Sequence, residues 1–112
     1  MKIDQNELNT DYLEQAPTSE QLSEMLGNVI VEFGVPECPH CQLTQPMLQT
    51  VLSVHPELTH IKIYDGKGKA LGRSFNVKLW PTLIFLQDGK EIDRLVRPLN
   101  VDEIDQLVMQ SK

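Results

Sequence analysis

The sequence predicts an α/β fold in which a mixed central β-sheet carries helices on both faces. Residues 29–33 are almost all apolar and β-branched or aromatic, which is typical of a central strand buried on both faces. A helical pattern follows at 39–54 and a strand pattern at 58–64, so these two strands are expected to run parallel in a β-α-β unit. Asp88-Gly89 then separates two further strand-like segments, and this dipeptide favours the tight turn of an antiparallel hairpin. Parallel pairing followed by a hairpin predicts a mixed sheet.

The expected elements follow one another in the order β-α-β-α-β-α-β-β-α. Thr18 and Gln21 form a capping-box pattern that begins the first helix, and Gly27 ends it. Asn100 is the expected N-cap of the last helix, with Glu103 three residues later. Strands are expected at 11–15, 29–33, 58–64, 82–86 and 92–96, and helices at about 18–26, 39–54, 70–75 and 100–108.

Length and charge exclude several classes of function. The 112 residues, 40% of them hydrophobic, suffice for one core, so residues 1–112 are expected to form a single domain with its core at about 11–108. The net charge of -6 argues against nucleic acid or an anionic membrane as a partner. No stretch approaches the roughly 20 apolar residues of a membrane helix. The first residues are too polar for a signal peptide, so we expect a cytoplasmic protein.

Both cysteines lie in one tetrapeptide, Cys38-Pro39-His40-Cys41, at the start of a predicted helix. Free backbone N–H groups and the helix dipole favour a thiolate at Cys38, so we assign it the first attack on a substrate disulfide. Cys41 lies one turn further and is expected to be more buried, so it would resolve the mixed disulfide. In a reducing compartment such a close pair is typical of a catalytic dithiol or a metal site rather than of a structural disulfide.

Three further residues are candidates for tuning this dithiol. His40 would stabilise the Cys38 thiolate, unless it is only a surface residue. Glu37 would oppose a second negative charge, and its alternative is a solvated loop position. Glu32 interrupts the buried strand, where a carboxylate is expensive, so we expect it to exchange a proton with Cys41. The alternative is a position at a sheet edge, where solvent satisfies the carboxylate.

Four features, in this order along the chain, resemble the thioredoxin family. They are the dithiol after a strand, Pro46 five residues past the second cysteine, Trp80-Pro81-Thr82 before the hairpin, and Gly89 in its turn. The resemblance covers roughly Asp11 to Val108. It implies the thioredoxin fold and a role in thiol-disulfide exchange.

The resemblance also implies roles for individual residues. Pro81 would be cis and face the dithiol, and Trp80, Pro81 and Thr82 would contact an extended substrate segment. Lys62 matches the family's lysine partner of a buried acid at Glu32. The indole of Trp80 would cover the dithiol, with a core position as its alternative.

The chain departs from the family pattern at the rim of the dithiol. Gly34 and Glu37 stand where the family often has tryptophan, and the family's glycine after the last strand falls near Arg97-Pro98. This part of the expected substrate groove is therefore bulkier and more polar.

The function these residues predict is protein disulfide oxidoreductase, acting as a cytosolic reductant without a cofactor. Its expected partners are disulfide-containing proteins and a reductase or small thiol as electron donor. The first alternative is a metal or iron-sulfur module that uses Cys38, His40 and Cys41. The second is a redox-inert thioredoxin-like adaptor. His55 and His60 are expected at the surface rather than as metal ligands.

Overall fold

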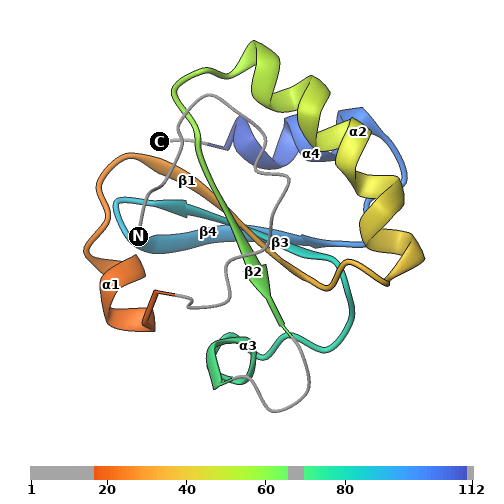
Figure 1. Cartoon of the computed structure of the whole chain (residues 1–112). Helices are drawn as coiled ribbons and strands as arrows, with labels where there is room; N and C mark the ends of the chain where they lie inside the picture. The colour runs from red at the N-terminus through yellow and green to blue at the C-terminus, as the bar shows by residue number, and fades with distance from the viewer. Residues whose placement is uncertain (1–16, 66–69, 111–112) are drawn as a thin grey trace.

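The computed structural model describes residues 17–65 and 70–110, and within these ranges a four-stranded sheet has the order β2-β1-β3-β4 (Figure 1). β1 runs parallel to β2 and antiparallel to β3, and β3 runs antiparallel to β4. The mixed sheet is therefore confirmed, whereas the strand expected at 11–15 lies outside the described residues. The strands are β1 Asn28–Gly34, β2 Thr59–Tyr64, β3 Thr82–Gln87 and β4 Lys90–Val96.

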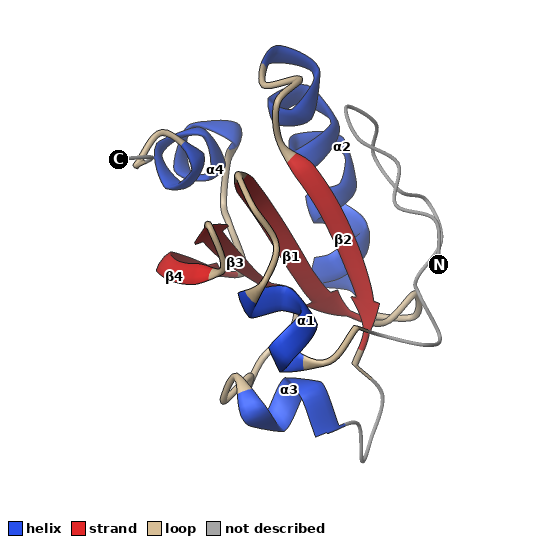
Figure 2. Cartoon of the chain, turned by 90° about the vertical axis from the view of Figure 1, so that its left-hand side faces the viewer, coloured by secondary structure: helices blue, strands red, loops and turns tan. Residues whose placement is uncertain are grey.

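The described helices cover both faces of this sheet. α2 and α4 pack against one face, and α1 and α3 lie on the other (Figure 2). This is the layering that the sequence predicts, because each helix buries one apolar side against the sheet. The helices are α1 Ser19–Ser23, α2 Pro39–Val54, α3 Ala70–Ser74 and α4 Val101–Val108.

The central strand β1 supplies side chains to both halves of the core. Ile30 belongs to the apolar cluster under α2 and α4, whereas Val31 and Phe33 belong to the cluster on the side of α1 and α3. Because side chains alternate along a strand, Glu32 lies on the same face as Ile30. The strand thereby places one carboxylate directly beneath α2.

The helix termini agree with the sequence except at the end of α1. Thr18 and Gln21 form the expected capping box, and the Asn100 side chain accepts from the backbone N–H of Glu103 at the start of α4. α1 ends at Ser23, earlier than expected, and Leu26, which was expected on this helix, lies beyond it and is 84% exposed.

The β3–β4 turn packs against the end of α1. Asp88 and Gly89 have φ angles of 50° and 82°, as a primed hairpin turn requires. A side chain at position 89 would collide with the backbone carbonyl of Ser23, so only glycine fits. The Asp88 carboxylate accepts from the Gly27 N–H at 2.8 Å, which connects the hairpin to the loop before β1.

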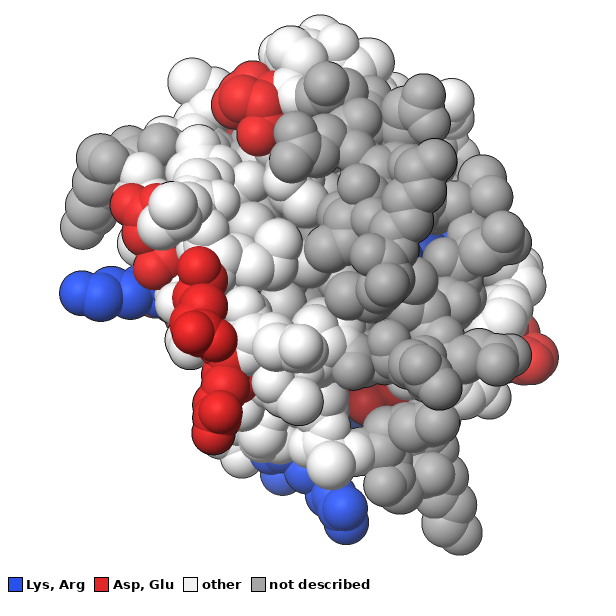
Figure 3. Space-filling view, turned by 60° about the vertical axis from the view of Figure 1, so that its left-hand side comes forward, with Lys and Arg blue, Asp and Glu red and all other residues white. Residues whose placement is uncertain are grey.

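Most of the charged surface visible in Figure 3 is acidic, in agreement with the net charge of -6. Asp and Glu side chains form a row along one side of this face, and Lys and Arg appear at its margins. In the ranges that the structure describes, no helix is both long enough and apolar enough to cross a membrane.

Candidate active site

The two cysteines occupy the first turn of α2, as expected. Cys38 is the N-cap residue, and its Sγ accepts the backbone N–H of Cys41 at 3.3 Å. Pro39 follows at the first helical position, where its missing N–H costs nothing. Cys38 is partly exposed whereas Cys41 is 1% exposed, and both are free thiols. Only Cys38 is therefore open to an incoming disulfide.

The loop before β3 faces this dithiol. The Trp80–Pro81 peptide bond is cis, as the resemblance implies. The Cys38 thiol points at the carbonyl oxygen of Trp80, with Sγ 3.8 Å from it. Thr82 is buried, and its hydroxyl donates to the carbonyl of Leu79 at 2.6 Å. The hydroxyl thus fixes the loop, and contact between Thr82 and substrate stays a prediction.

The indole of Trp80 is anchored to a buried acid at the end of β2. Its Nε1–H donates to Asp65 Oδ2 at 2.8 Å, and Asp65 is 8% exposed. Burial raises the pKa of the Asp65 carboxyl, and the hydrogen bond from the indole lowers it by a smaller amount. Gly72 of α3 lies so close to this carboxylate that a side chain there would collide with it. That the indole covers the dithiol stays a prediction.

Arg97 approaches the same loop from the end of β4. Its backbone N–H donates to the carbonyl of Pro81 at 3.0 Å, and its Nε donates to the carbonyl of Trp80 at 2.8 Å. Its φ angle of 50° lies in the left-handed region, which side chains disfavour. The polar side chain expected at this rim of the groove is therefore in direct contact with the loop before β3.

Glu32 has no exposed surface and lies beneath α2, inside the sheet rather than at its edge. One carboxylate oxygen lies 2.9 Å from His60 Nε2, and the other accepts from Gln45 Nε2 at 2.8 Å. The alternative of a solvent-satisfied edge position is therefore wrong. Two polar side chains compensate for the water that the carboxylate has lost.

Gln45 connects this carboxylate to the resolving cysteine and to Lys62. Its amide nitrogen donates to the backbone carbonyl of Cys41 at 3.0 Å as well as to Glu32, and its oxygen accepts from Lys62 Nζ at 2.9 Å. Lys62 is 4% exposed and is the strand partner of Glu32 in β2. The predicted pair of Glu32 and Lys62 is thus linked through an amide that the sequence reasoning missed.

His60 is the clearest error among the sequence-based expectations. It was expected at the surface, yet it is 0% exposed and contacts Glu32. A signal was present, because Leu58, directly before β2, alternates with His60 and Lys62 within it, so these side chains share the face that α2 covers. His55 is partly exposed, and its Nε2 lies 2.8 Å from Asp105 Oδ1.

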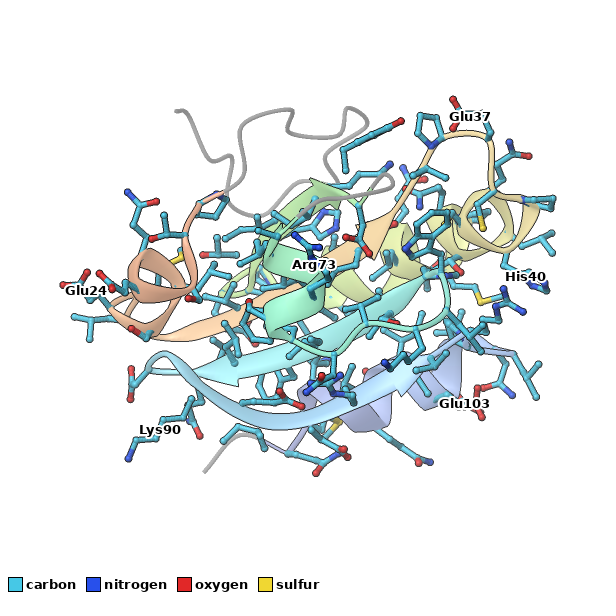
Figure 4. The ribbon with its side chains drawn as sticks, turned by 90° about the horizontal axis from the view of Figure 1, so that it is seen from below. Glu24, Glu37, His40, Arg73, Lys90 and Glu103 are labelled. Carbon is cyan, nitrogen blue, oxygen red and sulfur yellow. The ribbon has the colours of Figure 1, made fainter. Side chains whose placement is uncertain are left out.

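Glu37 directly precedes the dithiol and His40 lies between its two cysteines, and both side chains are exposed (Figure 4). The backbone carbonyl of His40 accepts the hydroxyl of Thr44 at 2.8 Å. Tuning of the dithiol by Glu37 and His40 stays a prediction. Nowhere in the described ranges do three His, Cys, Asp or Glu side chains converge as metal ligands would.

Comparison with known proteins agrees with this geometry. The chain is 31% identical to thioredoxin H-type 1 of Nicotiana tabacum over 68 residues, which cover 61% of the chain and 54% of that protein. It is 28% identical to a thioredoxin of Chlamydia trachomatis over 82 residues, 73% of the chain and 80% of that protein. The chain therefore spans only about half the length of the tobacco relative.

The solved structure of reduced thioredoxin 2 from Pseudomonas aeruginosa PAO1 superposes with a TM-score of 0.81 and 44% identity, covering 93% of this chain and all of that one. Desulfothioredoxin from Desulfovibrio vulgaris Hildenborough, at 22% identity and a TM-score of 0.76, shares the fold. The family model described as Thioredoxin matches residues 9–110. The chain belongs to the thioredoxin family, whose members are disulfide oxidoreductases.

Proposed function

We propose that this chain is a thiol-disulfide oxidoreductase that reduces disulfides in protein substrates. The observation that carries the proposal is the geometry of the dithiol. Cys38 is a partly exposed N-cap thiol beside a cis-proline loop, and Cys41 is buried one turn away. An accessible attacking sulfur and a protected resolving sulfur are what sequential disulfide exchange requires.

The proposed reaction has two exchange steps. The Cys38 thiolate attacks one sulfur of the substrate disulfide, and the other substrate sulfur leaves as a thiolate that takes a proton from water. Cys41 then loses its proton, attacks the Cys38 sulfur and releases the second substrate thiolate. Two electrons have passed to the substrate, and the chain holds a Cys38–Cys41 disulfide.

Glu32 is the proposed acceptor of the Cys41 proton. Its support is position: Gln45, on the same helix as Cys41, donates both to the Cys41 backbone carbonyl and to the Glu32 carboxylate, which holds that carboxylate beneath the first turn of α2. A carboxylate held within reach of a proton donor, directly or through one water, can act as its general base. His60 contacts the Glu32 carboxylate and Lys62 donates to the Gln45 amide oxygen. These two contacts hold the carboxylate and the amide in place.

The oxidised chain must be reduced again, and we propose a reductase or a small thiol as the donor. We place the reaction in the cytosol, because that compartment supplies the reducing equivalents. Fractionation of cells that express the tagged chain tests the compartment.

Reduction of insulin by dithiothreitol, followed by precipitation of the B chain, tests the activity. The wild-type chain is expected to accelerate precipitation, whereas Cys38→Ser is expected to abolish the acceleration. Metal analysis of the purified protein accompanies the assay. A chain that fails to accelerate the reaction but retains stoichiometric metal would contradict the oxidoreductase and support the metal-module alternative.

A further inference from the structure

Arg97 and the attacking sulfur share one acceptor. The Arg97 Nε–H donates to the Trp80 carbonyl at 2.8 Å, and the Cys38 thiol points at the same oxygen from 3.8 Å. The guanidinium and the sulfur therefore cannot be further apart than these two distances combined. A side chain next to the cysteine that is bonded to Cys38 in a mixed disulfide can therefore come within reach of this positive charge.

The position of the guanidinium is fixed from two directions. The backbone N–H of Arg97 is held by the Pro81 carbonyl, and its Nε is held by the Trp80 carbonyl. The Arg97 side chain is exposed, and among the residues that the structure describes only its Nε makes a hydrogen bond, to the Trp80 carbonyl. A guanidinium that is already oriented loses little conformational freedom when it binds a partner.

Arg97 also lacks a carboxylate partner among the residues that the structure describes. Arg94, three residues earlier on β4, makes a bidentate ion pair with Glu91 at 2.7 and 2.8 Å. Within residues 17–65 and 70–110, no carboxylate makes such a pair with Arg97. An oriented charge without an internal partner is suited to an external anion.

We propose that Arg97 is a specificity residue that selects disulfide substrates carrying an Asp or Glu side chain next to the attacked cysteine. The inference rests on the proposed oxidoreductase function and leaves its chemistry unchanged. A carboxylate beside the substrate sulfur would receive two parallel N–H donors from the guanidinium. The net charge of -6 repels acidic substrates at long range, so the preference arises from this short-range contact.

Single-turnover reduction of three peptide disulfides by the prereduced chain tests the proposal. The peptides are identical except for Glu, Gln or Lys beside the cysteine, with the variable residue placed before the cysteine in one set and after it in another. In at least one set the wild-type chain is expected to react several-fold faster with Glu than with Gln, and slowest with Lys. Arg97→Gln should remove this order, and Arg97→Glu should reverse it.

Two controls separate charge recognition from a structural effect. Lys90→Gln removes the same charge at the opposite end of the molecule from His40 and Glu37 (Figure 4), and it should keep the wild-type order. Arg97→Gly suits the positive φ, so it should fold well and still lose the Glu preference.

An unchanged preference in Arg97→Gln and Arg97→Gly, or an equal loss of rate for all peptides, would overturn the proposal. Oxidised glutathione, which carries its own carboxylates, forms a separate arm. A dependence on Arg97 for glutathione but not for the Glu peptides would also overturn it. Failure of the wild-type chain to reduce any peptide would contradict the proposed function itself.

Discussion

His60 Nε2 lies 2.9 Å from Glu32 Oε1, and neither side chain is exposed to solvent. The carboxylate at the centre of the sheet therefore has an imidazole on one oxygen and the Gln45 amide on the other. Because Gln45 also contacts the Cys41 carbonyl, a continuous set of hydrogen bonds runs from β2 to the first turn of α2. This set of contacts connects the interior of the sheet to the resolving cysteine.

Replacing Glu32 by Gln should slow the second exchange step more than the first. The amide keeps much of the shape of the carboxylate but cannot accept the Cys41 proton, and general-base catalysis contributes about 10² or more to such steps. Stopped-flow kinetics near neutral pH, with formation and decay of the mixed disulfide followed separately, measure both rates. Glu24→Gln, an exposed change at the far end of the molecule (Figure 4), is the control. Equal slowing of both steps would exclude a role for Glu32 in resolution.

Replacing His60 by Val should destabilise the fold. The change removes one of the partners of a fully buried carboxylate, and an unsatisfied buried polar group costs about 1–3 kcal/mol. Urea denaturation measures the free energy of unfolding. His55→Val is the matched control, because His55 is partly exposed and its ion pairs should contribute less than about 1 kcal/mol. If both variants lost a similar free energy of unfolding, the buried His60–Glu32 contact would contribute no more to stability than the partly exposed contacts of His55.

Asp65 should make stability depend on pH in the acidic range. Burial raises the pKa of Asp65 in the folded chain above its ordinary value of 3.8, so the folded state binds the proton more tightly than the unfolded state. The wild-type chain should therefore lose stability relative to Asp65→Asn as the pH rises from below 3.8 through the raised pKa. Melting curves of both proteins across this range measure the difference. A difference that is constant with pH, or that grows in favour of the wild type, would contradict the assignment.

Trp80 should report the redox state of the dithiol. It is the one tryptophan of the chain, its carbonyl lies 3.8 Å from Cys38 Sγ, and its indole is fixed by Asp65. Disulfide formation should therefore change its fluorescence intensity, because a sulfur pair quenches a nearby indole. A redox titration followed by emission, with Cys38→Ser as the silent control, measures the change. Emission that ignores redox state would place the indole away from the dithiol.

Much of the fold was predictable because its signals are local. The apolar run of β1, the capping box of α1 and the Asp88-Gly89 turn are each encoded within a few residues. The dithiol was equally readable, because its spacing and its place at a helix start are visible in the sequence. The end of α1 could not be predicted in this way, because the exposure of Leu26 depends on which distant segments of the chain pack near it.

The surroundings of the dithiol were less predictable because they depend on contacts between distant segments. Gln45 and Glu32 are 13 residues apart, His60 and Glu32 are 28 apart, and Trp80 and Asp65 are 15 apart. The alternation of Leu58, His60 and Lys62 indicates that His60 is buried, but it does not identify Glu32 on the neighbouring strand as the partner of His60. The register of β1 and β2 was needed to bring these groups onto one face.

The order of attack by the two cysteines is the central claim, and trapping of the mixed disulfide tests it most directly. Cys41→Ser and Cys38→Ser are each incubated, prereduced, with a disulfide substrate, and covalent adducts are measured by mass spectrometry. The account predicts that Cys41→Ser accumulates a stable adduct on Cys38, because the exposed sulfur attacks and nothing resolves the product. Cys38→Ser should remain nearly free of adduct, because Cys41 is 1% exposed. Adduct formation on Cys41 in Cys38→Ser, with none on Cys38 in Cys41→Ser, would contradict it.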